Sequence, residues 1–524
     1  MTFHCESEAL GTQASMAATL RPPSGAGMRE WLGLALLALP TILLGLDLTL
    51  LHLALPALAA DLRATSTQAL WIMDAYGFMI AGFLITMGTL GDRIGRRRLL
   101  MIGAATFAIA SVIAAFSTSA PMLIVARGAL GVAGATLMPS TLALISNLFV
   151  DPRQRALGFG IWATMFALGM AMGPVVGGVL LEHSWWGAGF LLAVPIVGLL
   201  LLLAPFLLPE YRAADSGRLD LVSVALSLAA MLPVIYGIKQ VAKGGSLAGA
   251  MVAIAAGLFF TALFVRRQRR LADPLLDLSL FGNRAFTVAL VVLLFGLVAV
   301  GGTMLLVTQY LQLVKGFSPL VAGLWMGPPA FAMVAAGIGA PLAARHIRPG
   351  FVVAGALALS AVGYLILSQL DMDGTGLASV IAGFSLAYLG LGTIAALGTD
   401  LVVGAAPAEQ AGSASAMSET VQDLGISMGI AILGSLSTAV YRNAMIDRMP
   451  DNLAGELREA VSDSLWAASA KAPQLPDGMI EKSQAAFVAG FNGAALLSAV
   501  TATMLAVLAA VALPHVGKLQ PLAE

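Results

Sequence analysis

The sequence alternates long apolar runs with short polar connections over almost its whole length. A helix needs about 20 apolar residues to cross the hydrocarbon core of a bilayer. Lipid offers the backbone no hydrogen-bonding partners, so such segments are expected to be helical. The pattern predicts fourteen spans, at residues 31–56, 69–90, 99–118, 121–147, 156–181, 188–208, 220–240, 248–265, 285–312, 320–343, 350–370, 377–403, 412–443 and 484–513.

The spans fall into two sets of six with two additional spans between them. The predicted fold class is therefore an all-α membrane protein of two six-helix bundles plus two central helices. The expected limits are 1–30 for a disordered N-terminal tail, 31–210 for the first bundle, 211–284 for the two extra helices and a linker, 285–513 for the second bundle, and 514–524 for a C-terminal tail. Met28 directly precedes the first span, so translation starts at either Met1 or Met28.

Arginine is concentrated on one side of the predicted membrane. The connections expected inside the cell contain Arg93, Arg96, Arg97, Arg98, Arg153, Arg155, Arg212, Arg218, Arg266, Arg267, Arg269, Arg270, Arg284, Arg345 and Arg348. The short outer connections contain only Arg63, Lys239, Lys243 and Lys315. The positive-inside rule therefore places both termini in the cytoplasm. The preference for arginine over lysine and the abundance of alanine favour a bacterial protein, and hence the inner membrane.

The connection 444–483 lies on the predicted outer side and is the longest there. Its stretch 451–470 alternates apolar and charged residues at helical spacing. This spacing predicts an amphipathic external hairpin that lies against the outer mouth of the protein. A solvated loop without function is the alternative that the pattern leaves open.

The composition excludes several classes of protein. Hydrophobic residues make up 59% of the chain and charged residues 11%, against roughly a quarter charged in soluble domains. This excludes an ordinary soluble enzyme. The formal net charge of +0 leaves no basic surface for nucleic acid, and the single cysteine, Cys5, excludes an intrachain disulfide. There is no phosphate-binding glycine loop and no metal-ligand cluster, so we expect neither ATP nor any other cofactor.

Four carboxylates lie inside predicted spans, at Asp47, Asp74, Glu419 and Asp423. A charge at membrane depth costs several kcal/mol unless it is paired, hydrated or protonated, so these acids are candidate functional groups. Glu419 and Asp423 are four residues apart and share one helix face, where two close carboxylates resist ionising together. We expect them to exchange protons for cations. A neutral, hydrogen-bonded pair that only shapes the helix is the alternative.

Arg127 also lies inside a predicted span, at a depth similar to that of Asp74. A guanidinium keeps its proton and needs a carboxylate or backbone partner there. We predict that Arg127 pairs with Asp47 or Asp74 and takes part in coupling, with a permanent structural ion pair as the alternative. His52 lies about one turn from Asp47 and could relay protons, but a polar residue at the rim of the protein is the favoured interpretation.

The connection after the second span, 88–98, combines glycines, an acid and arginines. The glycines permit a tight turn, the acid can accept hydrogen bonds from a helix N-terminus, and the arginines can pair with acids or anionic lipid. We expect this cluster to act as a conformational latch, formed by Gly88, Gly91, Asp92, Arg93, Gly95, Arg96 and Arg97. Arginines that only set the topology are the alternative. The segment 339–350 is a degraded copy of this motif that lacks the acid.

A second glycine motif lies in the fifth span. Gly169, Gly173 and Gly177 recur every four residues and give one flat helix face for close packing, and Pro174 adds a bend. Gly178 completes the motif. We expect this contact to shear during transport, whereas static helix packing is the alternative.

Aromatic rings attract desolvated cations and are expected to complete a cation site. The candidates are Trp71, Tyr76, Trp162, Phe166, Phe295, Tyr310, Trp325 and Tyr388. Packing or anchoring at the membrane interface is the common alternative for each of them.

Together these motifs resemble those of the major facilitator superfamily over nearly the whole chain. The segment 88–98 resembles its motif A, Arg127 its motif B arginine, and 169–178 its motif C, which is characteristic of antiporters. The segments 46–49, 70–76 and 418–425 resemble helices of its fourteen-helix drug:proton antiporters. The resemblance implies the major facilitator fold and alternating access.

The sequence thus predicts a proton-coupled multidrug efflux antiporter that exports lipophilic cations such as quaternary ammonium compounds and cationic dyes. The proton gradient would supply the energy, and the resemblance implies that the protein acts as a monomer. A proton-linked exporter of an endogenous metabolite or lipid is the alternative within this class. A membrane-embedded enzyme would need a catalytic cluster at the membrane surface, and the sequence does not contain one. A non-transporting sensor or scaffold would not need the buried acids.

Overall fold

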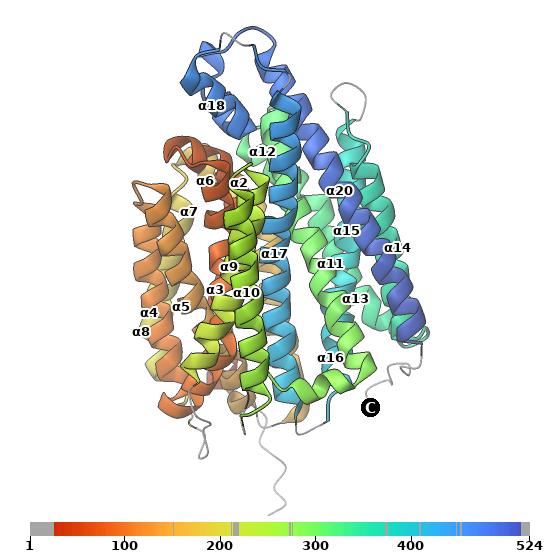
Figure 1. The fold of residues 1–524 in the computed structure, drawn as a ribbon. Helices are drawn as coiled ribbons and strands as arrows, with labels where there is room; N and C mark the ends of the chain where they lie inside the picture. Colours follow the sequence, from red (N-terminus) through yellow and green to blue (C-terminus); the bar gives the residue numbers. More distant parts are fainter. Residues whose placement is uncertain are drawn as a thin grey trace, which may run out of the picture.

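The computed structural model describes residues 26–514, except 150, 211, 213–219, 272–273, 275, 372–375, 408–409, 447 and 451–452. The N-terminal tail up to residue 25 and the C-terminal tail from residue 515 lie outside the described residues, so the structure does not test the predictions made for them. Within the described residues every regular element is a helix, and fourteen segments are long and apolar enough to cross a membrane (Figure 1).

The first half of the chain contains α2 (Met28–Asp61), α3 (Ser66–Ile94), α4 (Arg96–Ala115), α5 (Ala120–Leu148), α6 (Pro152–His183), α7 (Ala188–Leu191) and α8 (Ala193–Leu207). The additional helices are α9 (Leu221–Ala242) and α10 (Leu247–Gln268). The second half contains α11 (Arg284–Gln309), α12 (Pro319–Trp325), α13 (Gly327–Ala344), α14 (Pro349–Leu367), α15 (Leu377–Thr393), α16 (Thr399–Gly404), α17 (Ala411–Ile446), α18 (Gly455–Asp463), α19 (Leu465–Ala470) and α20 (Met479–Ala512).

All fourteen predicted spans coincide with spanning helices, but their limits and internal geometry differ in places. Helix α2 begins at Met28, so the last residues assigned to the tail are helical. The tenth span is broken at Met326, because the two prolines that follow Gly327 have no N–H to donate to the preceding turn. Single π-helical turns at Tyr310–Val314 and Ile394–Gly398 interrupt the ninth and twelfth spans.

Polar side chains fix the starts of several helices. Thr65 begins α3 in a capping box with Gln68, in which each side chain binds the backbone N–H of the other residue. Asn283 caps α11 by accepting hydrogen bonds from the N–H groups of Ala285 and Phe286. These caps satisfy backbone donors where the chain leaves the apolar layer.

The two ends of the molecule are chemically different. We call the end that contains the α3–α4 turn and Arg93, Arg96, Arg97 and Arg98 the arginine-rich end. The opposite end carries α18 and α19, at the top of Figure 1, and we call it the hairpin end. The predicted hairpin at 444–483 is thus present, as two short helices that cover this end.

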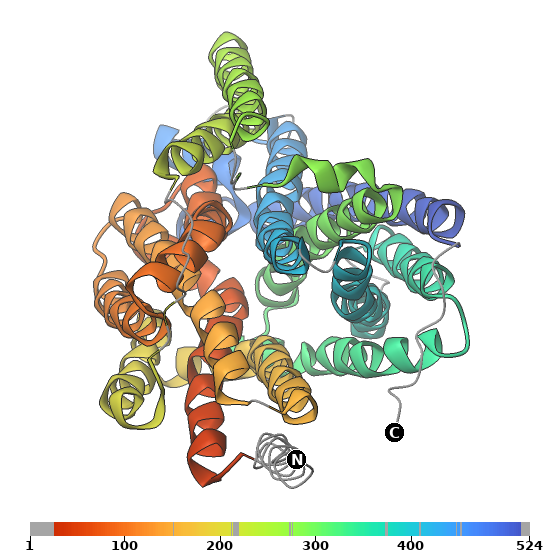
Figure 2. The same cartoon turned by 90° about the horizontal axis from the view of Figure 1, so that it is seen from below.

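The two halves contact each other from the middle of the molecule toward the hairpin end. Helix α3 packs on α17, and α6 packs on α12. The amide of Gln312 donates to the carbonyl of Leu53 across the interface at 3.2 Å. Asp463 of α18 accepts hydrogen bonds from the backbone N–H and hydroxyl of Ser66, at 2.8 and 3.0 Å. Seen from the arginine-rich end, α2–α8 form one group, and α11–α17 with α20 form another (Figure 2).

Helix α9 lies in the groove between α3 and α17, and α10 packs on the outer side of α9 at the periphery of Figure 2. At the arginine-rich end the pair is held together by Arg267, whose guanidinium donates to Asp220 at 2.8 Å. Burial disfavours the charge on Asp220, but hydrogen bonds from Arg267 and Ser223 outweigh it and lower the pKa of this carboxyl. The pair is therefore stable at neutral pH and is lost only as the pH falls through that lowered pKa.

Two glycines of α6 allow a matched test of this packing. A Cβ at Gly169 would lie 3.1 Å from the Cα of Gly45 in α2, whereas a Cβ at Gly160 would meet nothing within 4 Å. We expect Gly160→Ala to leave stability unchanged or to raise it by up to ~1 kcal/mol, the gain in helix propensity. Gly169→Ala should lower it by about 1–3 kcal/mol through overpacking. The melting temperatures of the purified proteins in detergent test this, and equal values would contradict the assigned contact.

Candidate functional site

The centre of the first half is an ion pair between α5 and α2. The guanidinium of Arg127 lies 2.7 Å from Asp47 Oδ2, and its Nε donates to the carbonyl of Ile72 at 3.2 Å. The ring of Tyr76 stacks under the guanidinium, with its centroid 4.4 Å from Cζ. Arg127 is 2% exposed and Asp47 12%. Of the two partners predicted for Arg127, the structure thus selects Asp47.

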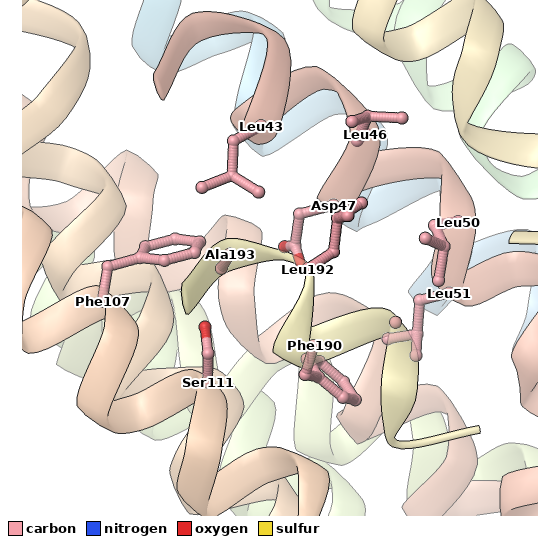
Figure 3. Close-up of a pocket in the computed structure, with 11 residues that line it drawn as sticks. Leu43, Leu46, Asp47, Leu50, Leu51, Phe107, Ser111, Phe190, Leu192 and Ala193 are labelled. Carbon is pink, nitrogen blue, oxygen red and sulfur yellow. The ribbon is translucent and has the colours of Figure 1, made fainter. Parts of the chain in front are cut away.

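Asp47 is less enclosed than Arg127 because it lines a narrow pocket of the first half. Figure 3 shows its carboxylate directed toward the chain at Leu192 and Ala193, with Phe107 and Ser111 on the neighbouring helix α4. The pocket is lined mostly by apolar side chains and leaves Asp47 partly open, whereas the guanidinium is covered by rings on two sides, since Phe190 lies 5.9 Å from Arg127 Cζ.

Asp74 does not pair with Arg127, the partner that the sequence analysis considered for it, but with a lysine. Lys239 of α9 donates to Asp74 Oδ2 at 2.8 Å, and both side chains are 1% exposed or less. The ammonium also lies 3.8 Å from the ring centroid of Trp71. The assignment of Lys239 to an outer connection is therefore wrong, because α9 continues past it to Ala242 and turns it toward α3. The other carboxylate oxygen, Oδ1, is buried without a hydrogen-bond partner.

Glu419 and Asp423 lie on consecutive turns of α17, as their spacing predicted. Asp423 is 6% exposed, near the middle of the helix. In the described part of the chain, neither carboxylate has a basic side chain at ion-pair distance. These two acids therefore differ from Asp47 and Asp74, which have an arginine and a lysine.

The turn of α17 that carries Asp423 crosses α3 beside the arginine site. A Cβ at Gly77 would overlap the Ser427 hydroxyl and would lie 3.3 Å from Ser427 Cβ and 3.4 Å from the carbonyl oxygen of Asp423, so the small residue favours this close approach. Gly77 is adjacent to Tyr76, the ring that stacks on Arg127. The turn of α17 that carries Asp423 therefore lies close to the Arg127–Asp47 pair, because it packs on Gly77, the residue next to Tyr76.

In this conformation the hydrogen bonds and ion pairs of the segment predicted to be a latch lie within the first half, as far as the described residues show. Gly95 has a φ of +110° at the turn between α3 and α4, which a residue with a side chain rarely adopts. Arg96 binds Asp92 at 2.7 Å, and Arg97 donates to the carbonyl of Leu208 at 2.9 Å. Glu210, which sequence reasoning missed, accepts from the Arg97 backbone at 3.2 Å.

The remaining members of the latch segment have no contact across the halves in the described residues. Arg93 is exposed, and Gly91 packs against the side chain of Arg96. Gly88 faces Pro139 of α5, with 3.9 Å between Pro139 Cβ and the position of a Cβ at Gly88. The cluster joins the α3–α4 turn to the end of α8, and Asp92 binds an arginine rather than a helix N-terminus of the second half.

The fifth-span glycines face two different partners. A Cβ at Gly173 would lie 3.0 Å from Thr49 Cβ, and one at Gly177 would lie 2.9 Å from Leu50 Cγ, so both glycines, like Gly169, pack on α2. Gly178 faces the second half, because its Cβ would lie 2.7 Å from the Cα of Leu320. The carbonyl group of Pro174 faces Gly323 of α12 in the same way. The motif therefore lies both where α6 packs on α2 and where α6 packs on α12 at the interface between the halves.

Six of the eight aromatic candidates divide into three groups. Tyr76 and Trp71 contact the protein's own cations, Arg127 and Lys239, rather than an open cavity. Trp162 and Phe166 are partly exposed and stacked, with 6.2 Å between centroids. Trp325 and Phe295 are exposed.

Two further aromatic candidates and the histidine are buried in this structure. Tyr310 and Tyr388 are buried in the apolar core of the second half, at 0% and 5% exposed, because neighbouring rings such as Phe491 and Phe384 pack against them. His52 is 1% exposed, so it is a buried residue beside the ion pair and not a polar rim residue.

Two packed halves of spanning helices, with charged side chains buried among those helices, define a multi-pass membrane transporter. The chain belongs to the Major Facilitator Superfamily, whose model matches residues 37–430. It is 43% identical over 485 residues to the multidrug efflux pump LfrA of Mycolicibacterium smegmatis, covering 92% of this chain and 95% of LfrA. It is 35% identical over 457 residues to the methyl viologen resistance protein SmvA of Salmonella typhimurium, covering 86% and 90%.

Solved structures support the fold. A bacterial homolog of the human lysosomal transporter Spinster, in an inward-facing and unoccupied conformation, matches with a TM-score of 0.67. The match covers 95% of this chain and all of that one, at 15% identity. At this identity the likeness concerns the arrangement of helices alone.

The Arg127–Asp47 pair can be tested by comparing single and double variants. Removing one member of a buried pair strands a charge, which costs about 3–5 kcal/mol, whereas removing both costs much less. We expect Arg127→Met and Asp47→Asn each to lower the melting temperature of the purified protein. The double variant should melt closer to wild type than Arg127→Met does. Additive losses would contradict an energetic coupling between the two side chains.

Proposed function

We propose that the protein is a proton-coupled multidrug efflux antiporter that exports lipophilic cations across the bacterial inner membrane by alternating access. The hairpin end faces outward and the arginine-rich end, with both termini, faces the cytoplasm, in keeping with the positive-inside rule. Its named relatives pump drugs or confer resistance. Methyl viologen, from which SmvA takes its name, is an organic dication, which favours cationic substrates here as well.

The observation that carries the proposal is the distribution of countercharges among the four buried acids. Asp47 and Asp74 are neutralised by Arg127 and Lys239. Glu419 and Asp423 have no such partner among the described residues, although Asp423 is almost fully buried. An unpaired carboxylate in a membrane protein is stable when it binds a proton or a cation. These two acids are therefore the proposed site of exchange.

The exchange follows from electrostatics. In the inward-open state a lipophilic cation enters from the cytoplasm or inner leaflet and binds near ionised Glu419 and Asp423, displacing protons into the cytoplasm. In the outward-open state protons neutralise the carboxylates, and the cation loses its countercharge and leaves. Each ligand lowers the affinity for the other, and this reciprocity is sufficient for antiport. Each proton moving inward along the potential contributes about 2.3 kcal/mol per 100 mV.

The Arg127–Asp47 pair has a supporting role in this scheme. The fixed guanidinium stacks on Tyr76, next to the turn of α3 that Asp423 approaches, so its charge favours the ionised state of nearby acids. Asp47 balances this charge within the first half. A change in the distance between α3 and α17 would then alter how strongly Arg127 acts on Asp423, and this links proton affinity to conformation.

The latch segment and motif C would serve the conformational change. In the present conformation the side chains of Asp92 and Arg97 bind within the first half, so these two residues do not hold the halves together at the arginine-rich end. The glycines of α6 give smooth backbone contacts with α2 and α12 along which the halves can shear. The protein would work as a monomer, with membrane lipids in contact with its arginines.

Carboxylate-to-amide variants test the proposed exchange site. We expect Glu419→Gln and Asp423→Asn each to reduce ethidium efflux from loaded cells at least about tenfold, a loss of about 1.4 kcal/mol or more in coupling. Purified wild-type protein should release protons into weakly buffered solution when ethidium is added. The double variant should release none, because no carboxylate is left to exchange at this site.

Glu182→Gln is the matched control, since Glu182 is an exposed acid at the hairpin end of α6. It should leave both measurements unchanged. A protonophore should abolish efflux by the wild type. If the double variant still concentrated ethidium against a gradient when a pH difference was imposed, the exchange site would be wrong. Wild-type protein that ignored ethidium and other lipophilic cations would favour the export of a metabolite or lipid.

A further inference from the structure

The additional helix α9 is joined to the first half by a buried polar contact and to the second half by apolar contacts alone. Lys239 binds Asp74 Oδ2 at 2.8 Å and lies 3.8 Å from the Trp71 ring centroid, both on α3. A Cβ at Gly82 of α3 would lie 2.7 Å from Leu228 Cδ2 of α9, so the helices are also close further along.

The contact of α9 with α17 has a different character. Its residues belong to one small apolar cluster that contains Ile235 and Met231 of α9 with Leu424, Met428 and Ala431 of α17. No hydrogen bond or ion pair joins these two helices in the part of the chain that the structure describes. Apolar surfaces can slide past one another without leaving an unpaired group, whereas separating Lys239 from Asp74 would strand two charges in a dry interior.

We propose that Lys239 is a positioning residue of the transport cycle, because it fastens α9 to α3 so that α9 travels with the first half and slides over α17. This inference rests on the proposed transport by movement of the two halves. Helix α10 packs on α9, so the whole additional pair belongs to the first half. The pair then covers the groove between α3 and α17 throughout the cycle.

The same contact assigns Asp74 a role distinct from that of Glu419 and Asp423. The charge of Asp74 already has a partner, so its loss acts by stranding Lys239. We expect Asp74→Asn and Lys239→Met each to reduce ethidium efflux about tenfold, and the double variant to recover to within about threefold of wild type. Adding Lys239→Met to the Asp423→Asn variant should not restore its ethidium efflux. A double variant of Asp74 and Lys239 as inactive as the worse single variant overturns the assignment.

Crosslinking tests the movement itself and separates positioning from simple stabilisation. Cys5 is the only cysteine of the sequence, so a Cys5→Ser background carries no other thiol. One cysteine pair, Gly82→Cys with Leu228→Cys, joins α9 to α3. The matched pair, Ile235→Cys with Ala431→Cys, joins α9 to α17. Both are treated in the membrane with the same short thiol crosslinker, and ethidium efflux is measured before treatment, after it, and after reduction.

We expect both pairs to transport before treatment. The α3–α9 crosslink should leave efflux within about twofold of the untreated protein. The α9–α17 crosslink should abolish it, and reduction should restore it, because only this bond would tie the two halves together. Loss of efflux on α3–α9 crosslinking, or continued efflux with α9 fixed to α17, overturns the inference while leaving the proposed function intact. Absence of efflux from the untreated protein overturns both.

Discussion

The structure depends on the neutralisation of charged side chains that lie inside an apolar layer. Arg127 and Lys239 are both at most 2% exposed, and each lies beside a carboxylate of the first half and an aromatic ring of α3. A lone charge at this depth costs several kcal/mol, so these pairs fix where α2, α5 and α9 lie relative to α3. Helix α3 supplies the rings and one of the acids. It is thus the element on which the polar interior of the first half converges.

The same helix is one of the places where the two halves pack closely against each other. Gly77 allows α17 to pass within van der Waals distance, next to the ring that stacks on Arg127. Because Glu419 and Asp423 lie on that part of α17 without countercharges among the described residues, a change in the α3–α17 contact changes the field that they experience. A transporter needs this dependence of proton affinity on conformation, and here one helix crossing can supply it.

Much of the fold could be predicted from the sequence because lipid imposes a simple rule on it. Long apolar runs must be helices, and all fourteen appear close to their expected positions. Residue type and depth predicted that Arg127 pairs with Asp47 or Asp74, and the structure selects Asp47. The pairing of Lys239 could not be predicted, since this residue lies near the end of an apolar run, where a lysine usually extends into water. Glu210 was missed because its arginine partners are more than a hundred residues away and nothing local indicates them.

Hydropathy alone did not predict the breaks inside helices or the placement of aromatic rings. The break at Met326 has a local cause in the two prolines that follow Gly327, whereas no such local signal marks the π-helical turns. Tyr310 and Tyr388 are of a residue type that suits a cation-binding cavity, yet packing in the second half buries them. Asp463 shows the opposite case, since a carboxylate in the connecting hairpin binds the N-terminus of α3, where the helix dipole favours a negative charge. Opening of the hairpin end must therefore break or carry along this bond, and α3 is constrained at its end as well as at its middle.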